Sequence, residues 1–499
     1  MTWSNILTYQ TKIKKKHNLD LLAGYEINSK ESDGLGTTIS NFARWDKPEV
    51  NNGVVYQSMG GSNSTTRIVS YITRANYDYD NKYYLGASWR TDGSSRLARE
   101  NRWGNFWSLS GAWRVSSESF MKPLQNWLSD LKLRVSYGVN GTLPSSYYGY
   151  MGLSSLTSNY NDNPGITQSQ LENKELTWET NYNFNSGIDL GFFDNRLNVT
   201  FEYYVRTTKN LLYSRPLSLA TGFSSYLANI GKLQNKGYEL EIRSTNIETK
   251  DFRWSTSLNL GHNANKILKL DGDLKQVTSG TSIHKVGLPY STYYMIEFAG
   301  IDPVDGEPMF YKNTTDENGN LNKETTKDRS AEKVILQCAD PTITGGLGNS
   351  ISYKWFDLNF NVNFSFGAWN YDGAAGKLEH GGDGTLNIPI YYRKRWQKEG
   401  DETSIERFVV GRSISMTDYA TTRRLYSGDY VRLKNLTFGF TLPKTWTRKV
   451  GIDNIRLYAS GNNLLTWAAY DYIDPESGSS PSWDTPPMRT YTFGLEVKF

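Results

Sequence analysis

The clearest pattern in the chain is the alternation of apolar and polar residues from Phe356 to Phe366. Every second position is a large apolar residue, and the positions between them are Asp, Asn or Ser. Successive side chains of a strand point to opposite faces, so this pattern predicts a strand with one apolar and one polar face. A strand of a β-sandwich can have such faces too. Six large apolar residues on one face nevertheless suit a lipid-facing strand about 10 residues long.

The same alternation recurs along the chain and predicts about 15 strands in total. The expected strands are 2–11, 17–27, 66–79, 81–91, 104–115, 131–138, 178–191, 195–206, 236–246, 252–262, 342–353, 355–367, 430–442, 453–461 and 489–498.

The predicted connections alternate strictly between short and long. The short ones are 14–16, 80–81, 194–195, 249–251 and 353–354, with two of medium length, 116–130 and 443–452, on the same side. The long ones are 28–65, 91–103, 139–177, 207–235, 263–341, 368–429 and 462–488. This sorting predicts an all-β, transmembrane antiparallel β-barrel with short periplasmic turns and long extracellular loops.

Composition and charge narrow the class of protein further. Hydrophobic residues make up 37% of the chain, and no run approaches the roughly 18 apolar residues of a membrane helix. Aromatic residues reach 14%, and Tyr and Trp favour membrane interfaces as well as carbohydrate and protein surfaces. The net charge of +4 is scattered, so no nucleic-acid footprint is present. Cys338 is the only cysteine, which excludes an intrachain disulfide.

The last residues of the chain also alternate, and they end on an aromatic residue. Tyr491 to Phe499 reads as a strand whose polar positions include Thr492 and Gly494. Thr492, Gly494, Val497 and Phe499 resemble the C-terminal signal that the barrel-assembly machinery reads. An ordinary last strand is the alternative interpretation.

The residues that follow Met1 lack the apolar core of a secretory signal peptide. A barrel protein must cross the inner membrane before it reaches the outer membrane. We therefore expect the sequence to be truncated at its N-terminus.

Several segments resemble the SusC/RagA family of TonB-dependent importers from Bacteroidetes. They are 76–96, 103–121, 131–141, 235–242, 429–443, 455–467 and 470–478. The family's usual SYGxTGN reads SYGVNG here, from Ser136 to Gly141, which is a mild departure.

This resemblance implies that 1–499 is the C-terminal part of a barrel of about 22 strands. An N-terminal plug, a TonB-contacting segment and the first strands would precede it. It also implies TonB-driven import of a large nutrient, a glycan or an oligopeptide, across the bacterial outer membrane. No enzyme activity is expected. A passive channel, a surface-binding adhesin and a barrel-mounted hydrolase are the alternatives.

The aromatic residues of the long loops are the best candidates for substrate contacts, because rings stack on sugars or clamp peptides. The candidates are Tyr147, Tyr148, Tyr150, Trp369, Tyr371, Trp467, Tyr470, Tyr472 and Trp483. The alternative is that these rings pack loops against loops or against a lid protein.

Two loops, 263–341 and 368–429, are far longer than a hairpin requires. They are rich in apolar and aromatic residues that need a surface to bury against: Tyr290, Tyr293, Tyr294, Phe298, Trp369, Tyr391, Tyr392 and Trp396. Neighbouring loops could supply that surface. The family resemblance instead implies a lid, a SusD-like surface lipoprotein that closes over the barrel mouth.

Metal sites are weakly indicated. Asp302, Asp305 and Glu307 are spaced acidic residues of the kind that can hold Ca²⁺, although Asp-Gly sequences also form plain turns. The four histidines show no zinc-ligand spacing. We therefore expect no cofactor apart from a possible structural Ca²⁺.

Overall fold

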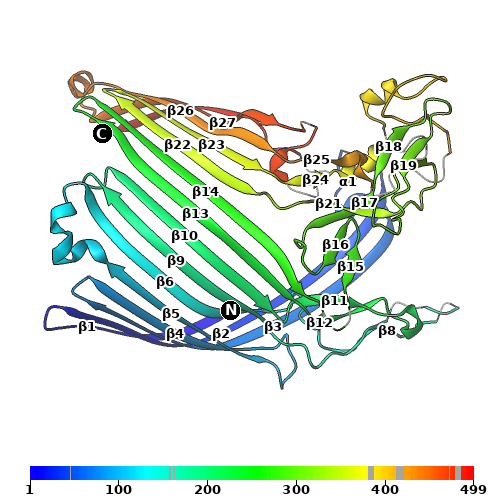
Figure 1. Cartoon of the computed structure of the whole chain (residues 1–499), viewed down its shortest axis with the longest axis horizontal. Helices are drawn as coiled ribbons and strands as arrows, with labels where there is room; N and C mark the ends of the chain where they lie inside the picture. The colour runs from blue at the N-terminus through cyan, green and yellow to red at the C-terminus, as the bar shows by residue number, and fades with distance from the viewer. Residues whose placement is uncertain are drawn as a thin grey trace. The chain divides into compact units, whose positions relative to one another are not determined.

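The computed structural model describes residues 1–499 except 45, 157–158, 162, 271, 273, 380–381, 383–386, 412–420, 471 and 478–484. Its main element is one antiparallel sheet of 15 strands that pair almost entirely in chain order (Figure 1). The strands of this sheet are β1 (Thr2–Ile13), β2 (His17–Phe42), β3 (Gly53–Tyr79), β4 (Tyr83–Ser94), β5 (Trp103–Arg114), β6 (Leu128–Thr142), β9 (Glu179–Phe192), β10 (Leu197–Lys209), β13 (Lys232–Glu248), β14 (Phe252–Lys269), β22 (Ile343–Tyr353), β23 (Phe356–Phe366), β26 (Tyr430–Thr441), β27 (Asn454–Ala468) and β28 (Thr490–Lys498).

All 15 predicted strands are present, most within a few residues of their expected bounds. Since neighbouring strands are antiparallel and almost all joined in chain order, the short turns lie at one end of the strands and the long loops at the other. This confirms the predicted antiparallel all-β architecture. The strands at the two ends of the sheet order, β1 and β28, each have one neighbour in it.

One predicted loop is wrong. Residues 28–65 form a two-stranded ribbon, because β2 and β3 stay paired from Asn28 and Ile68 out to Phe42 and Gly53. This segment is rich in Gly and Ser and lacks period-two alternation. Both faces of the ribbon are exposed, so no buried face imposed a pattern that the sequence could show.

The short turns are built by residues that accept a left-handed backbone. Asp80 and Asn81 have φ of 55° and 54°, and Asp194 and Asn195 have φ of 56° and 60°. Positive φ at two central residues matches the right-handed twist of the flanking strands, and Asp and Asn tolerate it well.

The chain divides into two compact units, which are described separately. Unit 1 comprises 1–118, 133–186 and 206–233. Outside the sheet it holds two small hairpins, β7 (Leu153–Ser155) with β8 (Thr167–Gln170) and β11 (Leu212–Pro216) with β12 (Ser225–Asn229).

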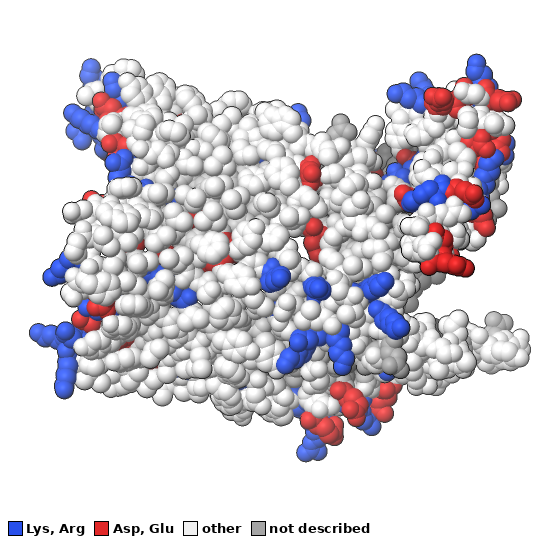
Figure 2. Space-filling view, in the orientation of Figure 1, with Lys and Arg blue, Asp and Glu red and all other residues white. Residues whose placement is uncertain are grey.

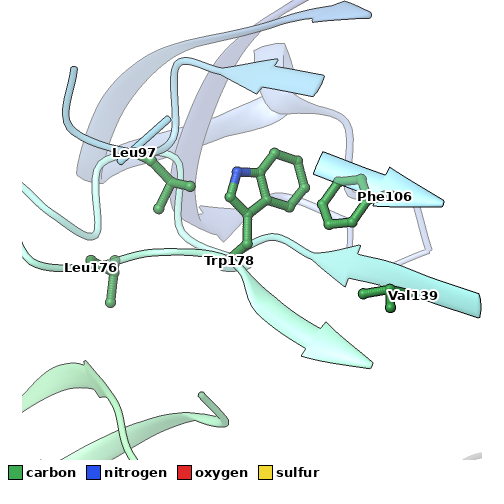
Figure 3. Packing of buried hydrophobic residues seen from close by; sticks show 5 residues of the cluster. All are labelled: Leu97, Phe106, Val139, Leu176 and Trp178. Carbon is green, nitrogen blue, oxygen red and sulfur yellow. The ribbon is translucent and has the colours of Figure 1, made fainter. Parts of the chain in front are cut away.

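Unit 1 has a small apolar core where its loops meet the strand ends. Leu97, Phe106, Val139, Leu176 and Trp178 are buried together, and the Phe106 and Trp178 rings meet edge to face at 5.2 Å (Figure 3).

Unit 2 comprises 119–132, 187–205 and 234–499. Its long loops form two small sheets, one of β15, β16, β17 and β21, the other of β18, β19 and β20. A third pair is β24 (Trp369–Tyr371) with β25 (Leu425–Ser427). The other loop strands are β15 (Gln276–Ser279), β16 (Ser282–Lys285), β17 (Thr292–Ile296), β18 (Phe298–Ile301), β19 (Pro308–Tyr311), β20 (Thr325–Thr326) and β21 (Lys333–Cys338).

The α-helices are short: α1 (Gly373–Leu378) and α2 (Lys444–Thr447), the latter followed by the 3-10 turn η8 (Arg448–Val450). Within the described part of the chain, no helix has the length and apolar character needed to cross a membrane.

Candidate functional site

The sheet of unit 2 has two chemically distinct faces, as the alternation at β23 predicts. A Cβ added to Gly345 would meet the Phe364 ring, whereas one added to Gly346 would meet the amide oxygens of Asn259 and Asn363. On the apolar face, the Phe356 ring stacks on Phe438 and Phe440 at 5.8 and 4.9 Å. One face is therefore apolar and aromatic, and the other is lined by amides.

Each unit carries a hollow that includes polar side chains of its sheet. The hollow of unit 1 has a volume of about 770 Å³, and its polar lining includes Asn18, Asp20, Asn76, Asp78 and Arg134. The hollow of unit 2 has a volume of about 1090 Å³, and its lining includes Glu202, Glu239, Arg243, Asn259 and Asn363. Such surfaces offer hydrogen bonds and charge to a hydrated solute or to a polar protein surface.

The three predicted tyrosines of unit 1 contribute to the structure of its loops. The Tyr148 hydroxyl accepts a hydrogen bond from the backbone N–H of Thr65 at 3.0 Å. The Tyr147 ring lies 4.3 Å from the Arg96 guanidinium. Tyr150 packs against the apolar core of the unit. These contacts match the alternative interpretation, in which the rings pack loops together.

Arg96, which the sequence did not single out, joins three segments of unit 1. Its guanidinium donates to the Thr66 hydroxyl at 3.3 Å and to the Pro144 carbonyl at 2.9 Å, in addition to lying over Tyr147. Its partners are 30 and 48 residues away, so no local pattern marks it.

In unit 2, two tyrosines from each of two long loops form what we call the tyrosine cluster: Tyr391, Tyr426, Tyr470 and Tyr472. The Tyr470 ring stacks on Tyr426 with centroids 3.7 Å apart, and the Tyr472 ring meets both Tyr470 and Tyr391. Burial and the nearby Asp372 carboxylate raise the pKa of Tyr470 above its usual range. Tyr472 is 70% exposed and is the member most open to a ligand.

The remaining aromatic candidates of unit 2 are spread out. Trp369 and Tyr371 lie on β24, where they pair with β25 and are half-buried. Trp467 lies near the end of β27 and is 59% exposed. Trp483 lies outside the described residues. The structure thus brings Tyr470 and Tyr472 together, with Tyr391 and Tyr426, which were not among the predicted site residues.

Beneath the tyrosine cluster lies a buried charge network that sequence reasoning missed. Glu406 is fully buried; it accepts hydrogen bonds from Tyr392 at 3.0 Å and from Arg423 at 2.5 Å. Glu379 accepts two from Arg424, at 3.1 and 2.9 Å, and one from the Tyr391 hydroxyl at 2.5 Å. Buried charges persist only when they are paired and hydrogen-bonded in this way.

The two longest loops also contact each other directly. Ile296 and Thr421 form a parallel β-bridge, and the Thr422 hydroxyl accepts a hydrogen bond from the backbone N–H of Phe298 at 3.0 Å. The Trp396 indole donates to the Pro303 carbonyl at 3.0 Å. Tyr293 and Tyr392 are buried. Neighbouring loops therefore supply much of the surface that these aromatic residues need.

The proposed calcium ligands are held by cationic side chains. Lys327 lies 2.5 Å from Asp302 and 2.7 Å from Asp305, and Arg407 donates to Glu307 at 2.7 Å. Lys327, together with backbone N–H donors, lowers the pKa of both aspartates. Among the described residues, no three His, Cys, Asp or Glu side chains gather as metal ligands. Calcium binding stays a prediction.

The proposed assembly signal lies on β28, which pairs with β27. A Cβ at Gly494 would lie 2.2 Å from the Tyr458 ring, so a larger residue there would require this ring to move. Thr492 pairs with Ser460, and Val497 with Ile455. Phe499 lies beyond the end of β28 and is 90% exposed within this chain. Its ring is therefore accessible to a protein that recognises it, such as the barrel-assembly machinery.

Comparison with known proteins agrees with this architecture. The model of the TonB dependent receptor-like, beta-barrel family matches residues 2–464. TonB-dependent receptor P3 of Formosa agariphila is 34% identical over 99% of this chain and 52% of its own length. TonB-dependent receptor SusC of Bacteroides thetaiotaomicron is 30% identical over 87% of this chain and 44% of its own.

Among solved structures, the RagAB peptide transporter matches 100% of this chain and 55% of its own, with a TM-score of 0.85 and 29% identity. The chain spans about half the length of these relatives. It therefore belongs to the TonB-dependent receptor-like β-barrel family of outer-membrane proteins, and within it to the SusC/RagA type.

Proposed function

We propose that this chain forms barrel wall and external loops of an outer-membrane active importer for a large nutrient, a glycan or an oligopeptide. The observation that carries the proposal is the likeness of the whole of this chain to 55% of the RagAB peptide transporter chain, with a TM-score of 0.85. The amide-lined and charged hollows support it, because a hydrated solute needs a polar wall. We assign no catalytic residue to the chain.

The energy for import would come from TonB. The outer membrane has no nucleotide supply, so a solute moves against its gradient only if force arrives from the inner membrane. In this proposal a plug domain and a TonB-contacting segment receive that force. This chain provides the path and the binding loops, with Tyr472 of the tyrosine cluster as the foremost candidate contact.

The proposed partner is a SusD-like surface lipoprotein that closes over the long loops of unit 2. The buried aromatic residues of these loops already pack against neighbouring loops. The support for a protein partner therefore comes from the apolar side chains that remain exposed. Val304, Ile390 and Val410 are 61%, 75% and 86% exposed in these otherwise water-facing loops. Each of these side chains offers apolar surface that a bound protein could cover.

Uptake by intact cells tests the import proposal. Cells expressing the full-length receptor would be given labelled oligopeptides and labelled oligosaccharides too large for porins. We expect one class to accumulate, and we expect accumulation to stop when TonB is deleted. Uptake that continues without TonB would instead support a passive channel. Surface binding without uptake would support an adhesin.

A pull-down from native membranes in mild detergent tests the lid. We expect a helical surface lipoprotein at stoichiometric amounts with the wild-type receptor, and less with the double variant I390D/V410D. The matched control L35D changes an equally exposed residue, 80% exposed, on the ribbon of unit 1. Recovery of the wild-type receptor without any such lipoprotein would remove the lid from the proposal.

A further inference from the structure

We propose that unit 2 binds the phosphate headgroups of anionic phospholipids at the short-turn end of β23, β26 and β27. The site, which we call the basic turn cluster, comprises Lys354, Trp355, Lys444, Trp446, Arg448 and Lys449. It lies at the opposite end of the strands from the long loops, so it is independent of the substrate-binding loops and of the lid.

Hydrogen bonds hold the two turns of this cluster side by side. The backbone N–H of Thr441 donates to the Trp355 carbonyl at 2.8 Å, which places the start of the 442–453 connection beside the turn at 354–355. That connection is ordered around Thr447, which is buried and whose carbonyl accepts from the N–H of Ile452 at 3.1 Å. The fold of the connection leaves Lys444, Trp446, Arg448 and Lys449 exposed.

The charge of the cluster is only partly neutralised. Lys444 lies 3.6 Å from Asp453. Within the described part of the chain, neither Arg448 nor Lys449 has a carboxylate within ion-pair distance. Lys and Arg side chains, with some Asp and Glu among them, gather at the edge of Figure 2 where Figure 1 draws the coil between β26 and β27. A local excess of positive charge attracts an anionic surface.

The basic turn cluster lies where strands that carry the apolar face of the sheet end. Phe356, Phe438 and Phe440 stack on that face. Lys354 precedes Phe356 by two positions, and Lys444 follows Phe440 by four, with Arg448 and Lys449 further along the same connection. Between them are Trp355 and Trp446, 46% and 59% exposed, and indole rings favour the membrane interface. Apolar, indole and basic side chains that meet at the ends of the strands are typical of a surface which enters the bilayer and ends at its headgroups.

The apolar face next to the basic residues favours a phospholipid over an acidic soluble protein as the ligand. An acidic soluble protein would use the charges but has no need of an adjoining lipid-facing band. A phosphate diester offers unesterified oxygens for Lys and Arg donors while its acyl chains cover the phenylalanines. In a barrel with short periplasmic turns, the lipid concerned lies in the inner leaflet of the outer membrane.

Lipid binding by the purified full-length receptor tests the proposal. Native mass spectrometry would compare phosphatidylglycerol with phosphatidylcholine, for wild type and for K444Q/R448Q/K449Q. We expect the wild type to bind phosphatidylglycerol more strongly than phosphatidylcholine. In the triple variant this binding ratio should fall roughly tenfold, since each basic residue near an anionic surface adds to the attraction. The control R393Q/K394Q/K398Q removes equal charge from exposed residues of a long loop and should keep the preference.

Salt dependence in the wild type gives a second readout that needs no variant. We expect the preference for phosphatidylglycerol to fall as NaCl rises from about 0.05 to 0.5 M, because exposed charges are screened. Equal binding of the two lipids by wild type, or an equal loss in the two triple variants, would overturn the proposal.

Discussion

The sheet and the long loops of unit 2 place apolar side chains in opposite positions. On the sheet, large apolar residues face outward, as with Phe438 and Phe493, which are 48% and 82% exposed. In the loops, Met295, Phe310 and Tyr392 are buried as in a water-soluble protein. Each part thus fits a different solvent. The apolar face of the sheet suits contact with lipid, whereas the loops form small cores of their own, as in a water-soluble protein.

The interactions that stabilise the sheet also differ from those that stabilise the loops. The sheet is held by backbone ladders between consecutive strands, which need no particular side chain. The loops depend on specific side-chain pairs across many residues, such as Glu379 with Arg424, 45 positions apart. A single substitution should therefore disturb the loops locally but leave the sheet intact.

The largest effect is expected at the buried charge network. Glu406→Gln removes the main partner of Arg423, which then keeps only Glu379 at 3.7 Å, a carboxylate that also pairs with Arg424. Breaking a buried ion pair costs about 3–5 kcal/mol. We expect faster hydrogen exchange and protease cleavage in 390–411, while heat-modifiable migration of the barrel is unchanged. Glu399→Gln changes an exposed glutamate of the same loop and serves as the control. Equal protection in both variants would show that the network does not hold the loop.

The next effect concerns the lipid-facing face of β23. Phe360→Arg puts a charge on the apolar face and should cost about 2–4 kcal/mol near the middle of the bilayer. Asn361→Arg, its neighbour on the polar face, should cost much less. Urea titration of the full-length receptor in lipid vesicles measures both. Similar losses from the two variants would mean that the faces are not divided between lipid and water.

The C-terminal residue should affect assembly rather than stability. Phe499 is 90% exposed within residues 1–499, so we expect its loss to weaken recognition by the assembly machinery more than it weakens contacts within this chain. We expect Phe499→Ser to lower the amount of heat-modifiable receptor in the outer membrane several-fold. Lys498→Ser, one position earlier, is the control. Wild-type levels in the Phe499 variant would count against its role as an assembly signal.

The smallest effect is a pH dependence of the loop around Asp302 and Asp305. Lys327 lowers the pKa of both carboxyls, so their stabilising contribution is present above the unfolded value near 4 and is lost as pH falls through the lower folded values. A spin label at Val304, in a Cys338→Ser background, should become more mobile below about pH 4. In the Lys327→Met variant, the label at position 304 should be mobile already at neutral pH. A label equally immobile in both proteins would contradict this.

The comparison also explains what could be predicted from the sequence. Strand β23 was predictable because one face is apolar along its whole length and the other is polar. The turns at Asp80 and Asn81 were predictable because their residue types suit a left-handed backbone. The ribbon of 28–65 was missed because neither of its faces is buried, so its sequence carries no pattern of period two.

The candidate site was harder to predict than the fold. The sequence singled out Tyr470 and Tyr472 as loop aromatics but could not pair them with Tyr391 and Tyr426 from another loop. Arg96 and Glu406 were missed for a similar reason, because their hydrogen-bond partners lie 14 to 48 positions away along the chain and no local spacing marks them. Long-range side-chain pairs need the three-dimensional arrangement of the loops before they can be recognised.

Accessibility along β23 tests most directly the claim that one face of this sheet lies in lipid and the other in water. Spin labels would be placed singly from 356 to 366 in the full-length receptor, in a Cys338→Ser background and in lipid vesicles. Collisions with oxygen, which concentrates in lipid, should peak at even positions, and collisions with a water-soluble nickel complex at odd positions. Labels at even positions that neither reagent reaches, as in a closed protein core, would contradict the account.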